Sequence, residues 1–247
     1  MKYTKTKFSP CLLLAMLLAL SCYDVARATT TIPTISSDHV DIFEAEYEQV
    51  GTDAPTIHLG VHADTHYEPG GVLLVVKNSA FRSTVGFSTE VIDILGSNAW
   101  ILPENLEAAI SLGLLEAGVA MAGFPAGSVT FTMVAAGAAN PGNFALFNST
   151  SATPIRLSAT KSGVGTSVGT SSFSISTDHI HYSWGFSALG TYTFDLKASY
   201  TDATFGKLES ATERYTFNVI PEPSSSTMLL IGLVGWVATR KRVALKE

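Results

Sequence analysis

Strict alternation of apolar and polar residues over positions 190–200 constrains the fold more than any other feature of the chain. The apolar members are Tyr192, Phe194, Leu196, Ala198 and Tyr200. A period of two is typical of a β-strand with one buried and one exposed face. The same period recurs over residues 56–64 and 211–219. The sequence therefore predicts a β protein.

Shorter apolar segments, separated by turn-forming residues, extend this pattern. They are residues 40–47, 72–77, 128–135, 144–147 and 172–176. About seven to nine strands of this kind predict an all-β fold, a single antiparallel β-sandwich. Residues 103–117 depart from the period of two, because their apolar residues recur at helical spacing behind Pro103. We expect one short helix there, covering a sheet edge.

The N-terminus has the composition of a secretory signal peptide. Three lysines precede an almost wholly apolar run over residues 11–20, and the small residues Ala26 and Ala28 follow. We expect a signal helix within residues 1–28, and an exported domain over residues 29–220. A lipoprotein signal that is cleaved before Cys22 is the alternative. The exported domain contains no cysteine, so its stability must come from its apolar core.

Three unlike elements follow one another at the C-terminus. They are Pro221-Glu222-Pro223, an apolar run over residues 228–238, and the basic patch Arg240-Lys241-Arg242. An apolar run followed directly by basic residues is typical of a short membrane helix with a positive cytoplasmic end. An ordinary C-terminal membrane anchor would have the same two features.

The order of these elements resembles the PEP-CTERM sorting signal, here residues 221–247. The resemblance implies that an exosortase-type processing enzyme recognises the chain near Pro221, Glu222 and Pro223. It also implies that Arg240, Lys241 and Arg242 orient the tail in the membrane. We therefore expect an exported protein of the cell envelope or cell surface, anchored in the membrane before processing.

The charge of the expected domain excludes one class of partner. Residues 29–220 carry seven Lys and Arg against eighteen Asp and Glu, a net charge of −11. A domain this acidic repels nucleic acid. An acidic surface attracts divalent cations, although it also keeps a protein soluble without any specific ligand.

Two histidines are the strongest candidates for chemistry. His179 and His181 are two residues apart on an expected strand, so their side chains project from the same face. Imidazoles in this arrangement can converge on one ion at about 2.0 to 2.1 Å. We expect His62 and His39 to supply further ligands, and zinc or another divalent metal to be the ion. The alternative is that these histidines only donate hydrogen bonds on a solvated face.

The segment that holds these histidines also resembles a known family. It contains His-x-His-x-x-Trp-x-Phe from His179 to Phe186, followed by Gly-Thr-Tyr-Thr from Gly190. With residues 141–147, 100–104 and 39–42, it resembles the bacterial surface-anchored domains called choice-of-anchor M. The resemblance implies a displayed β domain without known catalytic activity. Related domains occur beside metal-type transporters, which points to a role with cations.

Two common enzyme motifs are missing from the sequence. It has no His-Glu-x-x-His and no phosphate-binding glycine loop, so we expect no enzyme. Glu44, Glu46 and Glu48 alternate and are interpreted as a solvated strand edge. The alternative function is binding of extracellular polysaccharide or matrix, and a purely structural surface role is the third. The aromatic residues that could serve a glycan site are Trp100, Tyr47, Tyr67 and Tyr182.

Overall fold

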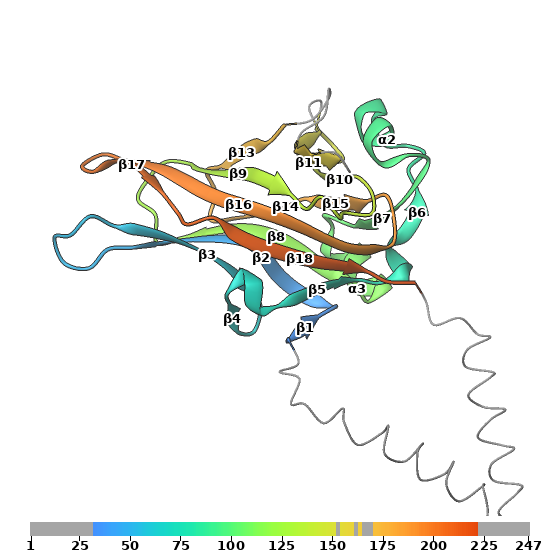
Figure 1. Cartoon of the computed structure of the whole chain (residues 1–247), viewed down its shortest axis with the longest axis horizontal. Helices are drawn as coiled ribbons and strands as arrows, with labels where there is room; N and C mark the ends of the chain where they lie inside the picture. The colour runs from blue at the N-terminus through green and yellow to red at the C-terminus, as the bar shows by residue number, and fades with distance from the viewer. Residues whose placement is uncertain (1–31, 152–153, 161–162, 165–169, 222–247) are drawn as a thin grey trace, which may run out of the picture. The chain divides into compact units, whose positions relative to one another are not determined.

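The computed structural model describes residues 32–221, except residues 152–153, 161–162 and 165–169 (Figure 1). The predicted signal peptide, residues 1–28, and residues 222–247 of the sorting signal lie outside this part. The described residues from Pro33 onward belong to one compact unit. They are mostly β, as predicted. Within the described residues, neither α-helix has the length and apolar content needed to cross a membrane.

The described strands form three sheets, here called A, B and C. Sheet A has the order β1-β5-β18-β16-β9-β13, and β17 pairs with β16. Its members are β1 (Thr34–Ile35), β5 (Leu73–Val76), β9 (Val129–Ala136), β13 (Ser172–Ile175), β16 (Gly190–Asp202), β17 (Gly206–Glu209) and β18 (Glu213–Val219).

Sheets B and C are smaller. Sheet B has the order β14-β8-β2-β3-β4 and sheet C the order β12-β11-β10-β15-β7-β6. The members of sheet B are β2 (Asp38–Glu48), β3 (Thr56–His62), β4 (His66–Tyr67), β8 (Leu115–Ala122) and β14 (His179–His181). Those of sheet C are β6 (Phe81–Ser83), β7 (Asn98–Leu102), β10 (Phe144–Phe147), β11 (Ile155–Thr160), β12 (Gly163–Val164) and β15 (Ser183–Phe186).

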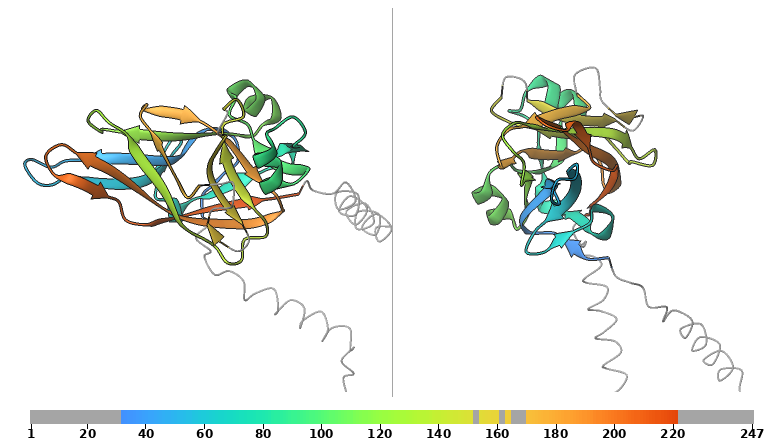
Figure 2. Two further views of the ribbon diagram at one scale, coloured as in Figure 1. Left: turned by 90° about the horizontal axis from the view of Figure 1, so that it is seen from above. Right: turned by 90° about the vertical axis from the view of Figure 1, so that its left-hand side faces the viewer.

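One apolar core joins the three sheets, whose packing is seen from two further directions in Figure 2. The Phe43 ring of sheet B lies 4.7 Å from the Trp184 ring of sheet C and 4.9 Å from the Tyr215 ring of sheet A. Two buried hydrogen bonds reinforce this packing. Trp184 Nε1 donates to the Ala117 carbonyl at 3.2 Å, and the Tyr215 hydroxyl donates to the Gly60 carbonyl at 3.3 Å. Sheet B is thereby fixed to both neighbours.

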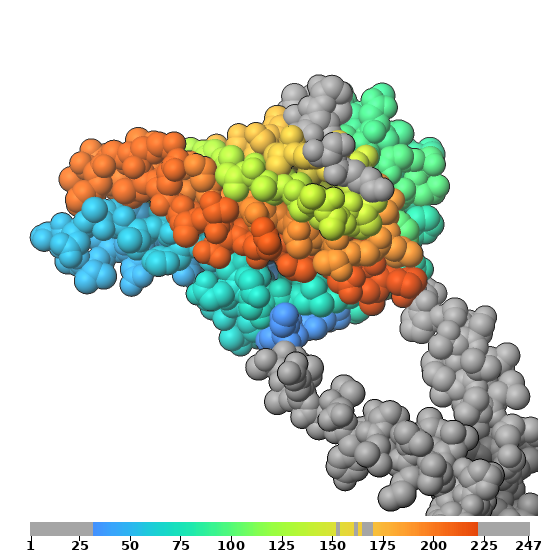
Figure 3. All heavy atoms as spheres, in the orientation of Figure 1, coloured from blue at the N-terminus to red at the C-terminus, as the bar shows by residue number. Residues whose placement is uncertain are grey.

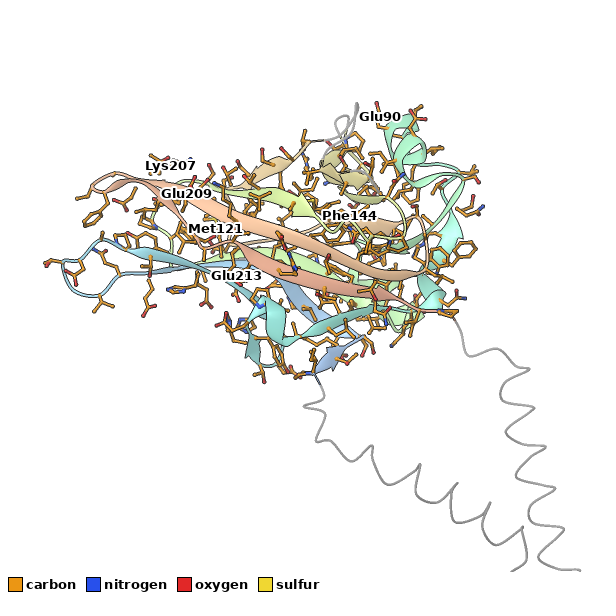
Figure 4. The ribbon with its side chains drawn as sticks, viewed as in Figure 1. Glu90, Met121, Phe144, Lys207, Glu209 and Glu213 are labelled. Carbon is orange, nitrogen blue, oxygen red and sulfur yellow. The ribbon has the colours of Figure 1, made fainter. Side chains whose placement is uncertain are left out.

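The long alternating segment behaves as predicted. Residues 190–200 lie in β16, where the five alternating apolar side chains are buried and the intervening residues are not. Phe144 of β10, labelled in Figure 4, packs against this buried face, with its ring 4.5 Å from that of Phe194. The contact joins sheet C to sheet A.

Two hairpins lie side by side at one end of the domain, β2–β3 in blue and β16–β17 in orange (Figures 1 and 3). The Tyr47 hydroxyl of β2 donates a hydrogen bond to Asp202 Oδ2 of β16 at 2.9 Å. Lys207 and Glu209, labelled in Figure 4, form a 2.6 Å ion pair on β17. The hydrogen bond to Asp202 holds the end of β2 against sheet A.

The prediction of a purely antiparallel arrangement is wrong at three pairings. β1 pairs with β5, β5 with β18, and β2 with β8 in the parallel sense. Parallel neighbours need a long connection, and each of these pairs is separated by several dozen residues of chain. Alternation does not reveal strand direction, because side chains alternate in both kinds of sheet.

The helix prediction for residues 103–117 is correct only in its middle. Helix α3 (Leu106–Leu112) begins behind Asn105, whose side chain accepts a hydrogen bond from the Ala108 backbone amide. It ends at Gly113, which has a left-handed conformation with φ of 60°. Soon after this glycine the chain enters β8 instead, so the last part of the predicted helix is a strand.

The prediction of a single helix is also wrong, because α2 (Thr89–Leu95) is a second one in the described residues. Its first turn is capped by Ser88, whose hydroxyl accepts a hydrogen bond from the Val91 amide. Its apolar face packs against β10 and β11 of sheet C, in a small core of its own. The remaining helical elements described are two short 3-10 turns, η1 (Pro69–Gly71) and η2 (Asn78–Ala80).

Candidate metal centre

A bulge in β2 determines which side chains share the face of sheet B. Asp41 lies opposite His62 of β3, and Glu44 lies opposite Gly60, with a register shift between them. Opposite residues of an antiparallel pair point to the same face, and His62 and Gly60 are two apart. The bulge therefore brings Asp41 and Glu44 to one face, although they are three residues apart. Two groups of histidines and carboxylates gather on it.

The first cluster comprises His39 and Asp41 of β2, Glu116 of β8, and His179 and His181 of β14. One ring nitrogen from each of the three histidines lies within 4.8 Å of the other two. The register explains this meeting, because β14 pairs with β8, and β8 pairs with β2. The sequence prediction that His39 joins His179 and His181 agrees with this geometry.

The two histidines of β14 converge most closely. His179 Nε2 and His181 Nε2 are 2.6 Å apart. A tetrahedral zinc ion with Zn–N bonds of about 2.0 to 2.1 Å holds its nitrogens about 3.3 Å apart. The rings need to separate by less than an ångström, roughly, to admit such an ion.

Two carboxylates lie against these rings. Asp41 Oδ1 is 2.8 Å from His179 Nδ1, the nitrogen that faces away from His181. The contact lacks hydrogen-bond alignment, so it is a close approach of the two atoms and not a hydrogen bond. Metal-binding imidazoles commonly have a carboxylate on the ring nitrogen that does not bind the ion.

Glu116 lies beside the three histidines, although none of its oxygens belongs to their 4.8 Å group. Its side chain is buried, with Oε2 3.1 Å from His39 Nδ1 and Oε1 3.4 Å from His181 Nε2. Burial lowers the pKa of His181, and the charges of His179 and His39 lower it further, against the opposing effect of Glu116. His181 is therefore held as neutral imidazole, the form that binds metal ions.

Gly118 makes room for the first cluster. A methyl group on this residue would overlap Asp41 Oδ1 and lie 2.7 Å from His179 Cε1. The φ of Gly118 is not positive, so the position requires glycine for space and not for backbone conformation. A glycine inside a strand often marks such a close approach.

Solvent reaches the first cluster beside His39. The His39 side chain is 48% exposed, and it borders two pockets of about 270 and 450 Å³. Leu106 and Ile110 of α3 line the smaller pocket, and Asp64 and Tyr67 line the larger one. An ion in solution therefore has access to the histidine nitrogens.

His62 does not join the first cluster. Its Nδ1 contacts Glu44 Oε2 at 3.3 Å, and it groups with Glu46 and His66 as well. We call Glu44, Glu46, His62 and His66 the second cluster. The interpretation of Glu44 as part of a solvated edge is wrong, because this residue is only 5% exposed. Glu44 shares a face with Glu46, as the alternation predicts, but His62 and His66 contact it there and shield it from solvent.

The predicted sorting residues lie almost entirely outside the described part. Pro221 is the last described residue and is exposed. Glu222, Pro223, Arg240, Lys241 and Arg242 lie beyond it.

A Gly-x-Ser-x-Gly pattern at positions 165–169 also falls outside the described residues. The next described element is β13, whereas a nucleophile elbow leads into a helix.

The aromatic residues considered for a glycan site are less open than the sequence indicated. Tyr182 is buried, and Tyr47, Tyr67 and Trp100 are half-buried. Trp100 Nε1 donates a hydrogen bond to Asn78 at 3.3 Å. Its ring lies 4.6 Å from that of Phe81, which is exposed at the edge of sheet C.

Comparisons of this chain with protein-family models, with curated proteins and with solved structures find no match.

Proposed function

We propose that this chain is an exported surface protein whose β domain binds a divalent transition metal, with zinc as the first choice, in the first cluster. The observation that carries the proposal is the convergence of His179 Nε2 and His181 Nε2 to 2.6 Å, beside the buried Glu116. With His39, the donors are three imidazoles and one carboxylate. This set suits zinc in tetrahedral coordination.

The ligand count favours a binding site over a catalytic one. Catalytic zinc sites keep one position for water or substrate, whereas structural sites use four protein ligands. His39, His179 and His181 offer three, and we propose that the buried Glu116 beside them moves in to fill the fourth. We therefore propose that the domain holds its ion and does not act as an enzyme.

The export part of the proposal rests on the ends of the sequence. We propose that residues 1–28 are removed as a signal peptide and that residues 221–247 sort the protein through an exosortase-type enzyme. We also propose that the displayed domain is a variant of the β-sandwich, in which sheet A forms one layer and sheets B and C together form the other. Replacing Pro221, Glu222 and Pro223 with alanine should block processing and leave a longer chain in the membrane fraction. An unchanged mature size and surface exposure would reduce the tail to an ordinary anchor.

Elemental analysis of the full chain tests the metal proposal. The protein would be purified in mild detergent, without chelator and without a metal-affinity tag. We expect His179→Ala/His181→Ala to lose one equivalent of metal per chain. The matched control is Glu48→Gln/His58→Ala, which alters an exposed 3.5 Å pair on β2 and β3 outside both clusters. Equal metal content in the wild type and the β14 variant would contradict the proposal.

A thermal measurement provides an independent check. A ligand at about 100 times its Kd stabilises the folded state by about 2.7 kcal/mol. Zinc should raise the melting temperature of the wild-type chain more than that of His179→Ala/His181→Ala, and a chelator should reverse the effect.

The second candidate function is adhesion to a glycan or to extracellular matrix. The exposed Phe81 ring and its contact with Trp100 favour it, because adjacent aromatic rings at a surface provide a stacking platform for sugars. Polysaccharide should then shift the tryptophan fluorescence of the wild type but not of Trp100→Phe. An absence of any shift, together with bound metal, would leave the first cluster as the functional site.

A further inference from the structure

The second cluster also has the composition and geometry of a metal site. We infer that Glu44, Glu46, His62 and His66 bind a second divalent ion, with no ligand shared with the first cluster. One donor atom from each of these four side chains lies within 4.8 Å of the others. This inference does not depend on the proposed function, because different residues carry it.

Three consecutive strands build the second cluster. Glu44 and Glu46 lie on β2, His62 ends β3, and His66 begins β4. His62 and His66 are direct cross-strand partners, so their side chains leave the sheet on the same face. Their rings meet edge to face, with centroids 6.3 Å apart. The four donors are thus fixed by strand pairing and not by loops.

A buried carboxylate oxygen lies at the base of the cluster. Glu44 is 5% exposed, and its Oε2 is buried without a hydrogen-bond partner. His62 Nδ1 is 3.3 Å from this oxygen and His66 Nδ1 is 3.5 Å from it. A buried carboxylate oxygen without a hydrogen bond is costly unless a cation compensates it. The carboxylate points to the place where an ion would supply that compensation.

Glu46 adds the second carboxylate from the more exposed side. Its Oε1 is 3.5 Å from His66 Nδ1. His66 Nδ1 therefore lies between a buried and a half-buried carboxylate. An ion that displaced the proton of this nitrogen would have donors from all three strands around it.

Gly60 makes the room that His66 occupies. A methyl group on Gly60 would overlap the ring at Cε1 and lie 2.8 Å from His66 Nε2. As at Gly118, φ is not positive, so the close approach of the ring explains the glycine. The strand interior is thus shaped around the imidazole.

Two carboxylates and two imidazoles form a ligand set that is richer in hard oxygen donors than the set of the first cluster. Carboxylate ligands suit manganese and other oxygen-preferring ions, while imidazole suits zinc and iron. The second cluster should therefore discriminate less strongly between manganese and zinc. We choose these two ions as probes.

The competing explanation is that the four residues form ion pairs only, with protonated histidines compensating Glu44. Equilibrium dialysis of the full chain in detergent against Zn²⁺ or Mn²⁺, followed by elemental analysis, separates the two. With His179→Ala/His181→Ala as the background, only the second cluster remains. We expect one equivalent of metal in this background, lost on adding His62→Ala/His66→Ala. Metal content that does not respond to this addition would overturn the inference.

A shape-preserving variant guards against a loss caused by misfolding. Glu44→Gln keeps the size of the side chain and removes its charge, so we expect at least tenfold weaker binding with an unchanged circular dichroism spectrum. Glu48→Gln/His58→Ala again serves as the matched control and should retain the ion. If wild-type protein holds one ion that is lost only on changing β14, the first site stands and the second falls. If the ion is lost only on changing His62 and His66, the reverse holds.

Discussion

The two clusters share a face of sheet B but are assembled in different ways. The first draws its ligands from β2, β8 and β14, which are distant in the sequence, and is rich in imidazole. The second comes from the consecutive strands β2, β3 and β4, and half its donors are carboxylates. Each lies over a strand glycine and includes a buried glutamate. In both clusters, a glycine in the strand lacks a Cβ, and this leaves the space in which the imidazole rings pack against the sheet.

The largest effect that separates the clusters is expected from Trp184→Phe. The change removes core volume and leaves the buried Ala117 carbonyl without its 3.2 Å hydrogen bond, so we expect a loss of about 2 to 4 kcal/mol in unfolding free energy. Ala117 lies between Glu116 and Gly118, so zinc binding by the first cluster should weaken while the second is unaffected.

Urea unfolding and zinc titration would measure these effects. Trp100→Phe is the control, because Trp100 is half-buried and its hydrogen bond goes to a side chain. An equal loss of stability in the two variants would show that the Trp184 contact does not support β8.

Adding a methyl group at Gly118 or at Gly60 should show which of the two clusters is the more rigid. Gly118→Ala forces overlap with the half-buried Asp41 and with His179, and should cost about 2 kcal/mol of unfolding free energy. The three atoms nearest to a methyl group at Gly60 all belong to the His66 ring, which is 38% exposed and can turn aside. Urea unfolding should therefore show the smaller loss for Gly60→Ala.

Gly70→Ala is the control for these two variants, since a methyl group there meets nothing within 4 Å. A greater loss for Gly60→Ala than for Gly118→Ala would reverse the proposed ranking.

Asp41→Asn should distinguish orientation of a ligand from binding itself. Removing the charge behind His179 Nδ1 should weaken zinc binding at the first cluster at least tenfold, or about 1.4 kcal/mol. Isothermal titration would measure this. Asp38→Asn is a matched loss of charge, at an exposed residue with φ of 74°, a conformation that asparagine tolerates. Equal affinities in the two variants would remove Asp41 from the site.

The smallest effect concerns the end of β2 beyond the second cluster. Hydrogen bonds from the backbone amides of Phe205 and Thr204, with that of the Tyr47 hydroxyl, hold the pKa of Asp202 below its usual value. A carboxyl with a lowered pKa in the folded state stabilises the protein above its unfolded pKa of about 3.9, and this stability is lost as pH falls through the folded pKa.

Melting temperatures measured between about pH 5 and pH 2 should therefore fall less steeply for Asp202→Asn than for the wild type. Asp53→Asn, on the exposed connection between β2 and β3, is the control. Parallel curves for the wild type and Asp202→Asn would show that this carboxylate does not contribute to the acid sensitivity.

The fold was predictable wherever one face of a strand is exposed. Residues 190–200 lie in β16, and most of residues 211–219 lie in β18, as their alternation indicates. β8 escaped prediction because nearly all its residues are buried, which removes the alternation. Its small residues, such as Ala117 and Ala120, also fit helical spacing. The sequence contains too little information to separate a fully buried strand from a helix.

The candidate site was predictable in part for a related reason. The shared face of His179 and His181 follows from their spacing, and His39 meets them. Glu116 could not be chosen from sequence, because it belongs to the strand that was interpreted partly as a helix. The separation of His62 from His179 depends on sheet order, which no local pattern encodes. Whether either cluster binds metal stays a prediction for the experiments above.

The sequence distance between the ligands of the first cluster has a consequence for when the ion is acquired. If the chain crosses the membrane from its N-terminus, the second cluster can close once β4 has emerged, whereas the first must wait for β14. Whichever compartment receives the end of the chain then supplies the ion for the first cluster. The order of the strands in the chain would thereby determine in which compartment each cluster can bind its ion.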